Sequence, residues 1–123
     1  MKKIYTDMAP EPIGPYSQGI KQGELLFVSG QLGILPDGSL ASGIEKQTER
    51  AIANIGKILE EAGTSFENVI KTTCFLKSLS DFAEFNRVYG ECFTGKPARS
   101  CVEVSALPKD ALVEIEVVAF CAQ

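Results

Sequence analysis

The stretch of sequence that decides the fold reads PARSCVEVSALPKDALVEIEVVAF and covers residues 97–120. Its composition predicts two strands, 99–106 and 112–120, joined by a turn at Pro108-Lys109-Asp110. Side chains alternate along a strand, so each of these strands has a polar face and a more aliphatic face. We expect the aliphatic faces to lie on the core, with the charged side chains directed away from it.

The sequence does not fix the register of these two strands, but their charged residues disfavour one arrangement. Glu103 directly opposite Glu114 would place like charges together, which is unfavourable. A shift of two residues places Cys101 opposite Glu114 and Arg99 opposite Glu116. This register predicts a single patch that contains an arginine, a thiol and two carboxylates.

The bulk properties of the chain indicate one soluble domain over residues 1–123. The hydrophobic share of 45% and the charged share of 23% are ordinary for such a domain. A net charge of -4 and a pI of about 4.9 argue against affinity for nucleic acid or an anionic membrane. No apolar run approaches the roughly 20 residues that cross a bilayer. No signal peptide is visible, because no apolar segment follows the N-terminal lysines.

The cysteine and histidine content limits the catalytic groups and metal sites that this chain can provide. The four cysteines are scattered without a CxxC pair, which is typical of reduced thiols in a cytoplasmic protein. The chain has no histidine, so a Ser-His or Cys-His nucleophile pair is excluded. No metal-ligand spacing is visible either, and we expect neither a metal nor a cofactor. Acid–base work would fall to carboxylates, tyrosine, lysine, cysteine or water.

Hydrophobic periodicity predicts the remaining elements. The most regular pattern is a helix over 43–62, with a capping box at Ser42 and Glu45 and a C-cap at Gly63. Ser80 is predicted to cap a second helix. The other predicted elements are strands, at 2–6, 16–21, 25–31 and 69–77.

Three residues are open to two interpretations. Gly30 ends an apolar strand, where it either permits close approach by a ligand or forms a simple bulge. Tyr16 follows a stiff proline-rich segment, 8–15, and is a packing residue or a positioned hydroxyl, with packing favoured. Asn86 lies at the edge of the apolar stripe of the second helix, where it holds a loop or meets a partner chain.

The elements together predict an α+β fold, a mixed five- to six-stranded sheet with two helices on one face. Two helices cover one face only of such a sheet. The uncovered face would mix Leu112, Val118 and Phe120 with Glu114 and Glu116. A partly apolar open face favours a homo-oligomer built through the sheet.

The stretches Pro97–Val104 and Val113–Glu116 carry a resemblance to a known family. Together with Ile13–Tyr16, Val28–Gln31 and Val69–Thr73, they make residues 13–120 resemble the reactive intermediate deaminase family, RidA subfamily. The resemblance implies a trimeric chorismate-mutase-like fold. In that fold three subunits pack their sheets into a central barrel, and active sites lie in the clefts between neighbours.

The same resemblance implies roles for individual residues. Arg99 would bind a carboxylate, Glu114 would hold the attacking water, and Tyr16 would supply a hydroxyl. The residues expected to line the site are Ser29, Gly30, Asn86 and Cys101. The chain departs from the family in its short loop Thr94-Gly95-Lys96, where relatives often have an apolar residue before the proline.

The function implied is hydrolysis of 2-imino acids, such as 2-aminoacrylate, 2-aminocrotonate and their imines, to 2-keto acids and ammonia. Such an enzyme would be cytoplasmic, would protect pyridoxal-phosphate enzymes, and would need no metal and no cofactor. The alternative is a module of the same fold that binds small molecules or proteins without catalysis. Family members have also been described as translation inhibitors with ribonuclease activity, which the acidic pI and the missing histidine disfavour here.

Overall fold

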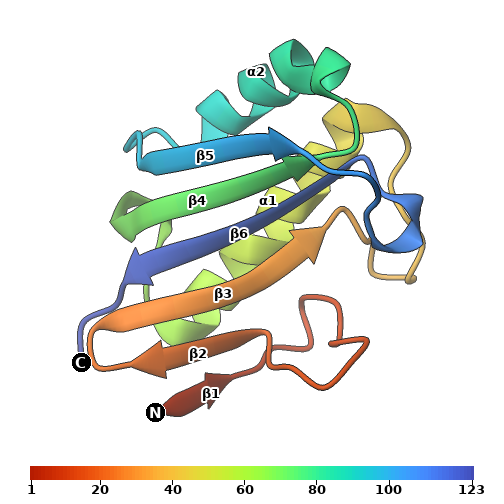
Figure 1. Ribbon diagram of the computed structural model, residues 1–123. Coiled ribbons are helices and arrows are strands. Elements are labelled where there is room, and N and C mark those ends of the chain that lie inside the picture. The colour runs from red at the N-terminus through yellow and green to blue at the C-terminus, as the bar shows by residue number, and fades with distance from the viewer.

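Six strands form one mixed sheet in the order β1-β2-β3-β6-β4-β5 (Figure 1). The structure is a computed structural model and describes all of residues 1–123. Every neighbouring pair of strands is antiparallel except β4 and β5, which run parallel. The strand bounds are β1 Lys2–Ile4, β2 Gly19–Gln22, β3 Leu25–Leu32, β4 Val69–Leu76, β5 Ala98–Glu103 and β6 Val113–Phe120.

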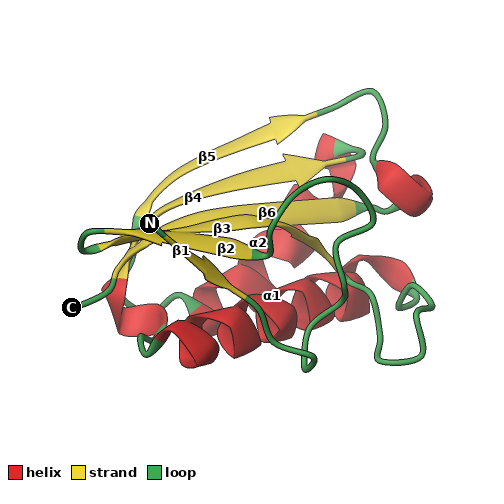
Figure 2. Cartoon of the chain, turned by 90° about the horizontal axis from the view of Figure 1, so that it is seen from below, coloured by secondary structure: helices red, strands yellow, loops and turns green.

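Both helices, α1 (Gly43–Ala62) and α2 (Phe82–Cys92), cover the same face of the sheet (Figure 2). Ile55 and Ile58 of α1 are fully buried with Leu26 of β3, in one core cluster between the two layers. The opposite face of the sheet is uncovered. The predicted α+β architecture, a mixed sheet with two helices on one face, is therefore confirmed. Neither helix has the length and apolar character that a membrane span requires.

The predicted pairing of the last two strands is wrong. β5 does not lie beside β6, because β4 lies between them. Arg99 is paired with Thr72 of β4 rather than with Glu116, and Cys101 is paired with Cys74 rather than with Glu114.

The connection from β5 to β6 explains this arrangement. Instead of a tight hairpin, the chain passes over the end of β4, where the Val104 N–H donates to the Leu76 carbonyl and the Lys77 N–H donates to the Leu112 carbonyl. In the predicted turn, Lys109 has a positive φ of 59° within a short 3₁₀ segment. β6, buried on its aliphatic face, takes the central place, and β5 takes the edge.

The predicted C-cap of the first helix is confirmed, whereas the predicted N-terminal caps of both helices differ from the structure. α1 has the predicted bounds, and Gly63 ends it in the left-handed conformation with φ 89°. Ser42 occupies the N-cap position, but its side chain makes no capping hydrogen bond. α2 begins after Asp81 rather than at Ser80, because a 3₁₀ turn precedes it.

Candidate functional site

A β-bulge shapes the first part of the candidate site. Val28 is paired with Val117 and Gln31 with Ile115, so Ser29 and Gly30 together lie opposite the single residue Glu116. A Cβ atom on Gly30 would lie 2.7 Å from Glu114 Oε2. The bulge interpretation of this glycine is confirmed, and the missing side chain makes room for a carboxylate of the same chain.

Glu114 lies half-buried on the open face of the sheet, on β6. Burial raises the pKa of its carboxyl above the usual value, and the neighbouring Glu116 carboxylate raises it further. The carboxyl lines a small cavity of about 50 Å³ together with Tyr16 and Gly30. We call this cavity the glutamate pocket. A carboxyl with a raised pKa is suited to exchange protons close to neutral pH.

Tyr16 reaches the glutamate pocket from the segment 7–16, which we call the strap. Its side chain is 48% exposed, so the favoured packing interpretation is not supported. The hydroxyl accepts a hydrogen bond from the Ile13 N–H at 3.3 Å and is therefore held in position at the pocket. Ser29 lies beneath, where its Oγ donates to the Ser17 carbonyl at 2.6 Å and ties the strap to β3.

Sequence reasoning missed Gln18, which anchors the strap. Its side chain is 1% exposed, and its Oε1 accepts from the Thr6 N–H at 2.7 Å. Its Nε2 donates to the carbonyls of Thr6 and Pro10, both at 3.0 Å. A single buried amide thus holds the first part of the segment that leads to Tyr16. A glutamine beside a proline-rich loop gives no distinctive pattern by which it could have been found.

Arg99 forms the second part of the candidate site, on β5. Its guanidinium carbon lies 4.7 Å from the ring centroid of Tyr89 and 5.6 Å from that of Phe82. Its Nη1 donates to Asn86 Oδ1 at 2.7 Å. It takes part in no ion pair with a carboxylate of this chain. An oriented guanidinium without a counter-ion is available to an external carboxylate.

The partners of Arg99 come from one face of α2, where Phe82, Asn86 and Tyr89 recur at helical spacing. Asn86 thus holds the arginine rather than a loop. The spacing of four and then three residues is the signal in the sequence that the rings of Phe82 and Tyr89 share a face with Asn86. Thr72 of β4 fixes the ring of Tyr89 through a 2.7 Å hydrogen bond between the two hydroxyls.

The cavity around Arg99 has a volume of about 700 Å³ and is lined by Asn86, Tyr89, Lys96 and Pro97, among others. We call it the arginine pocket. The shortened loop places Lys96 on its wall, with a positive φ of 54°. No acidic residue lines this cavity, so two cationic side chains face it.

Cys101 lies beside Cys74 on the neighbouring strand. Burial raises the pKa of the Cys101 thiol, an effect that Arg99 partly opposes. Burial also raises the pKa of Cys74, to about 12. Both thiols are therefore protonated at neutral pH, which disfavours a thiolate nucleophile.

The two pockets lie on opposite faces of the sheet, which corrects the predicted patch. Arg99 shares its face with Thr72 and the side chains of α2. Glu114 and Glu116 point to the open face, as predicted. The aliphatic side of β5, with Val102 43% exposed, belongs to that open face and not to the core. Within one chain, the arginine and the glutamates therefore do not share a patch.

These features define a small α+β protein with an unpaired arginine at a sheet edge and a half-buried glutamate on the open face. Residues 6–121 match the family model described as Endoribonuclease L-PSP. A RutC family protein of Pyrococcus abyssi is 55% identical over 120 residues, which cover 95% of this chain and 94% of the relative. The chain therefore belongs to the Endoribonuclease L-PSP family.

Solved structures agree with this assignment. RidA from the Antarctic bacterium Psychrobacter sp. is 42% identical, with a TM-score of 0.94 over 98% of this chain and 99% of that one. TdcF of E. coli, solved with bound serine, is 39% identical, with a TM-score of 0.95 over 99% of this chain and 100% of that one. The predicted membership of the Rid and RidA group is thus confirmed.

Proposed function

We propose that this protein is a deaminase that hydrolyses reactive 2-imino acids and their enamine tautomers to 2-oxo acids and ammonia. The observation that carries the proposal is Arg99, an oriented guanidinium that has no carboxylate partner in its own chain. Every substrate of this class bears a carboxylate, which a guanidinium grips with two parallel hydrogen bonds.

The hydrolytic step needs a placed water and a proton carrier. The water oxygen attacks the carbon of the protonated imine, the electron pair of the C=N π bond passes to nitrogen, and the proton that the water loses passes to Glu114. Glu114 then returns this proton to the amine nitrogen. The carbon–nitrogen bond breaks with its electron pair leaving on ammonia, and the hydroxyl gives its proton to Glu114 as the keto group forms. The raised pKa of Glu114 supports this shuttle. The Tyr16 hydroxyl, which lines the same pocket, would orient the water.

The proposal includes assembly of the site between copies of the chain, as a homotrimer with intersubunit active sites. Two observations support it. Arg99 and Glu114 lie on opposite faces of one sheet, so a neighbour is needed to bring the two groups together. The open face also exposes large apolar side chains, among them Phe27 at 46% and Phe120 at 40%, which a neighbouring sheet would cover.

A coupled assay tests the activity directly. A threonine dehydratase generates 2-aminocrotonate in the cuvette, and release of 2-oxobutanoate is followed with and without this protein. We expect faster release in proportion to added protein, with no effect of a metal chelator. Release at the uncatalysed rate at every protein concentration would contradict the proposal.

The same preparation distinguishes catalysis from binding alone. A non-catalytic binding module would bind the 2-oxo acid product but leave the rate of imine hydrolysis unchanged. Incubation with single-stranded RNA tests for ribonuclease activity. We expect no cleavage, because the chain is acidic and lacks histidine.

A further inference from the structure

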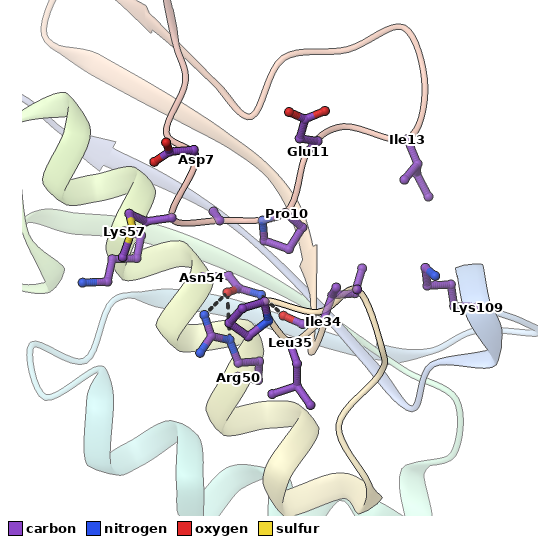
Figure 3. A pocket seen from close by; sticks show the side chains of 14 residues that line it. Asp7, Pro10, Glu11, Ile13, Ile34, Leu35, Arg50, Asn54, Lys57 and Lys109 are labelled. Atoms are coloured by element: carbon purple, nitrogen blue, oxygen red, sulfur yellow. Dashed lines mark hydrogen bonds between the residues drawn. The ribbon is translucent and has the colours of Figure 1, made fainter.

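A third cavity, distinct from the glutamate and arginine pockets, lies under the strap (Figure 3). Its volume is about 510 Å³, within the usual range for small-molecule sites. One wall is the strap, the second is the middle of α1, and the third is the segment 34–38 that follows β3. We call it the strap pocket. The family resemblance and the proposed deamination leave it without a role.

The α1 wall of the strap pocket presents an arginine that has no counter-ion. Arg50 donates from Nε and Nη2 to Asn54 Oδ1, at 3.0 and 2.9 Å, and takes part in no ion pair. Asn54 is fully buried, and its amide nitrogen donates to the carbonyls of Leu32 and Ile34. The guanidinium is therefore oriented by a rigid partner, while its Nη1 edge makes no hydrogen bond.

The other walls complement this cation with opposite charge and with apolar surface. Asp7 lies on the strap across the cavity from α1, and its carboxylate takes part in no ion pair and no hydrogen bond (Figure 3). Pro10, Ile34 and Leu35 also line the cavity, and we call them its apolar floor.

Three further charged residues also line the cavity: Glu11, Lys57 and Lys109. Glu11 accepts a hydrogen bond from the Tyr5 hydroxyl and Lys57 forms an ion pair with Glu60, whereas Lys109 takes part in no ion pair. The cavity thus offers cationic groups, anionic groups and an apolar floor.

We propose that the strap pocket binds a free α-amino acid with an aliphatic side chain. Arg50 would bind the carboxylate, Asp7 the ammonium group, and the apolar floor the side chain. A simple monocarboxylate would leave Asp7 unpaired.

The strap pocket communicates with the glutamate pocket through shared residues. Pro10, Glu11, Ile13 and Ile34 line both cavities, and the Ile13 N–H holds the Tyr16 hydroxyl. An amino acid under the strap therefore contacts the same segment that positions Tyr16. This gives the bound amino acid a physical route to the candidate active site.

The test is an NMR titration of ¹⁵N-labelled Arg99→Ala protein with L-valine. The Arg99→Ala background removes carboxylate binding in the arginine pocket, so a failure of the proposed deaminase function leaves this test intact. We expect saturable shifts at the amides of Asp7, Arg50 and Asn54, with a Kd of about 1 mM or tighter. Shifts that do not saturate, or that cluster away from the strap, would overturn the proposal.

Single-residue variants test which side chain binds the carboxylate and which binds the ammonium group of the amino acid. Arg50→Gln should weaken L-valine binding at least tenfold. Asp7→Asn, which touches no buried hydrogen bond, should weaken L-valine binding similarly while leaving binding of the matching 2-oxo acid unchanged. Lys46→Gln, also on α1 but outside this cavity, is the matched control and should leave the Kd unaltered. Equal affinity in the Asp7→Asn and parent proteins would refute the ammonium contact.

Discussion

The arginine pocket and the glutamate pocket are built in different ways. In the first, Arg99 projects from an edge strand and is held by the rings and the amide of α2, beside a cavity of about 700 Å³. In the second, Glu114 projects from a central strand into about 50 Å³, against a glycine that leaves it room. One pocket is wide and cationic, whereas the other is narrow and anionic.

This difference indicates how the chemistry is divided. A wide cationic cavity is suited to receive a substrate carboxylate, and a narrow one with a half-buried carboxyl is suited to hold a water and move protons. Neither pocket contains both groups, because the sheet separates them. We infer that two copies of the chain each contribute one pocket to a shared active site.

Glu114→Gln should have the largest effect. The amide keeps the shape of the side chain but cannot accept the water proton, so we expect kcat to fall by about 10²–10⁴ with a smaller change in KM. In the parent protein, kcat/KM should fall as pH drops through the raised pKa of Glu114. Steady-state kinetics over a range of pH measure both, and an unchanged kcat in the variant would contradict the assigned role.

Arg99→Ala should come next. Loss of the carboxylate contact should lower kcat/KM by roughly 10² or more, since removing one partner of such a pair typically costs about 3–5 kcal/mol. Arg99→Lys should be nearly as damaging, because an ammonium cannot form the two parallel hydrogen bonds. The melting temperature should change little. A large fall in melting temperature at full activity per folded molecule would instead assign Arg99 a structural role.

Gly30→Ala should have an intermediate effect. The added methyl would meet Glu114 Oε2 at 2.7 Å, so the flexible carboxyl must move while the backbone stays in place. We expect kcat to fall by about tenfold. Gly90→Ala in α2, where an added methyl meets nothing within 4 Å, is the control for stability and should raise the melting temperature slightly. A Gly30→Ala enzyme with the parent kcat would show that the position of the carboxyl is not critical.

The smallest expected effect concerns stability and pH. A carboxyl whose pKa is raised by folding contributes stability below its unfolded pKa of about 4.3, and that stability is lost as pH rises through the folded value. At pH 8 the half-buried carboxyl is charged, and its charge destabilises the folded protein. Glu114→Gln removes the charge, so the variant should melt at a higher temperature than the parent at pH 8. The advantage should vanish near pH 4. Melting curves of the parent and the variant at pH 8 and pH 4 test this expectation. A lower melting temperature for the variant at pH 8 would contradict a destabilising charge on Glu114.

The sequence was sufficient for the local structure and for the layer architecture. The helix at 43–62 was predicted with its observed bounds because its apolar residues repeat at helical spacing over 20 residues. The open, partly apolar face was predicted because two helices can cover only one face of a sheet of this size. Alternation also placed Glu114 correctly, because the aliphatic face of β6 is strongly apolar.

The pairing of β5 required information that local patterns lack. Strands that follow each other in sequence are usually neighbours, which favoured a hairpin of β5 with β6. β4 lies between them instead and pairs with both, through contacts between residues that are distant in the sequence. β5 is an edge strand with weak alternation, since Ser100 and Val102 face solvent, so its core side could not be read from composition. Because the core side of β5 was predicted wrongly, Arg99 was also predicted on the wrong face of the sheet.

Subunit complementation is the most direct test of an active site shared between two copies of the chain. Arg99→Ala and Glu114→Gln chains, each inactive alone, are mixed in equal amounts, unfolded in denaturant and refolded together. If each active site takes Arg99 from one copy and Glu114 from another, about a quarter of the sites in the mixture recover both groups, and about a quarter of the parent activity returns. A mixture that stays as inactive as its two components, while sizing shows mixed oligomers, would contradict a site shared between chains.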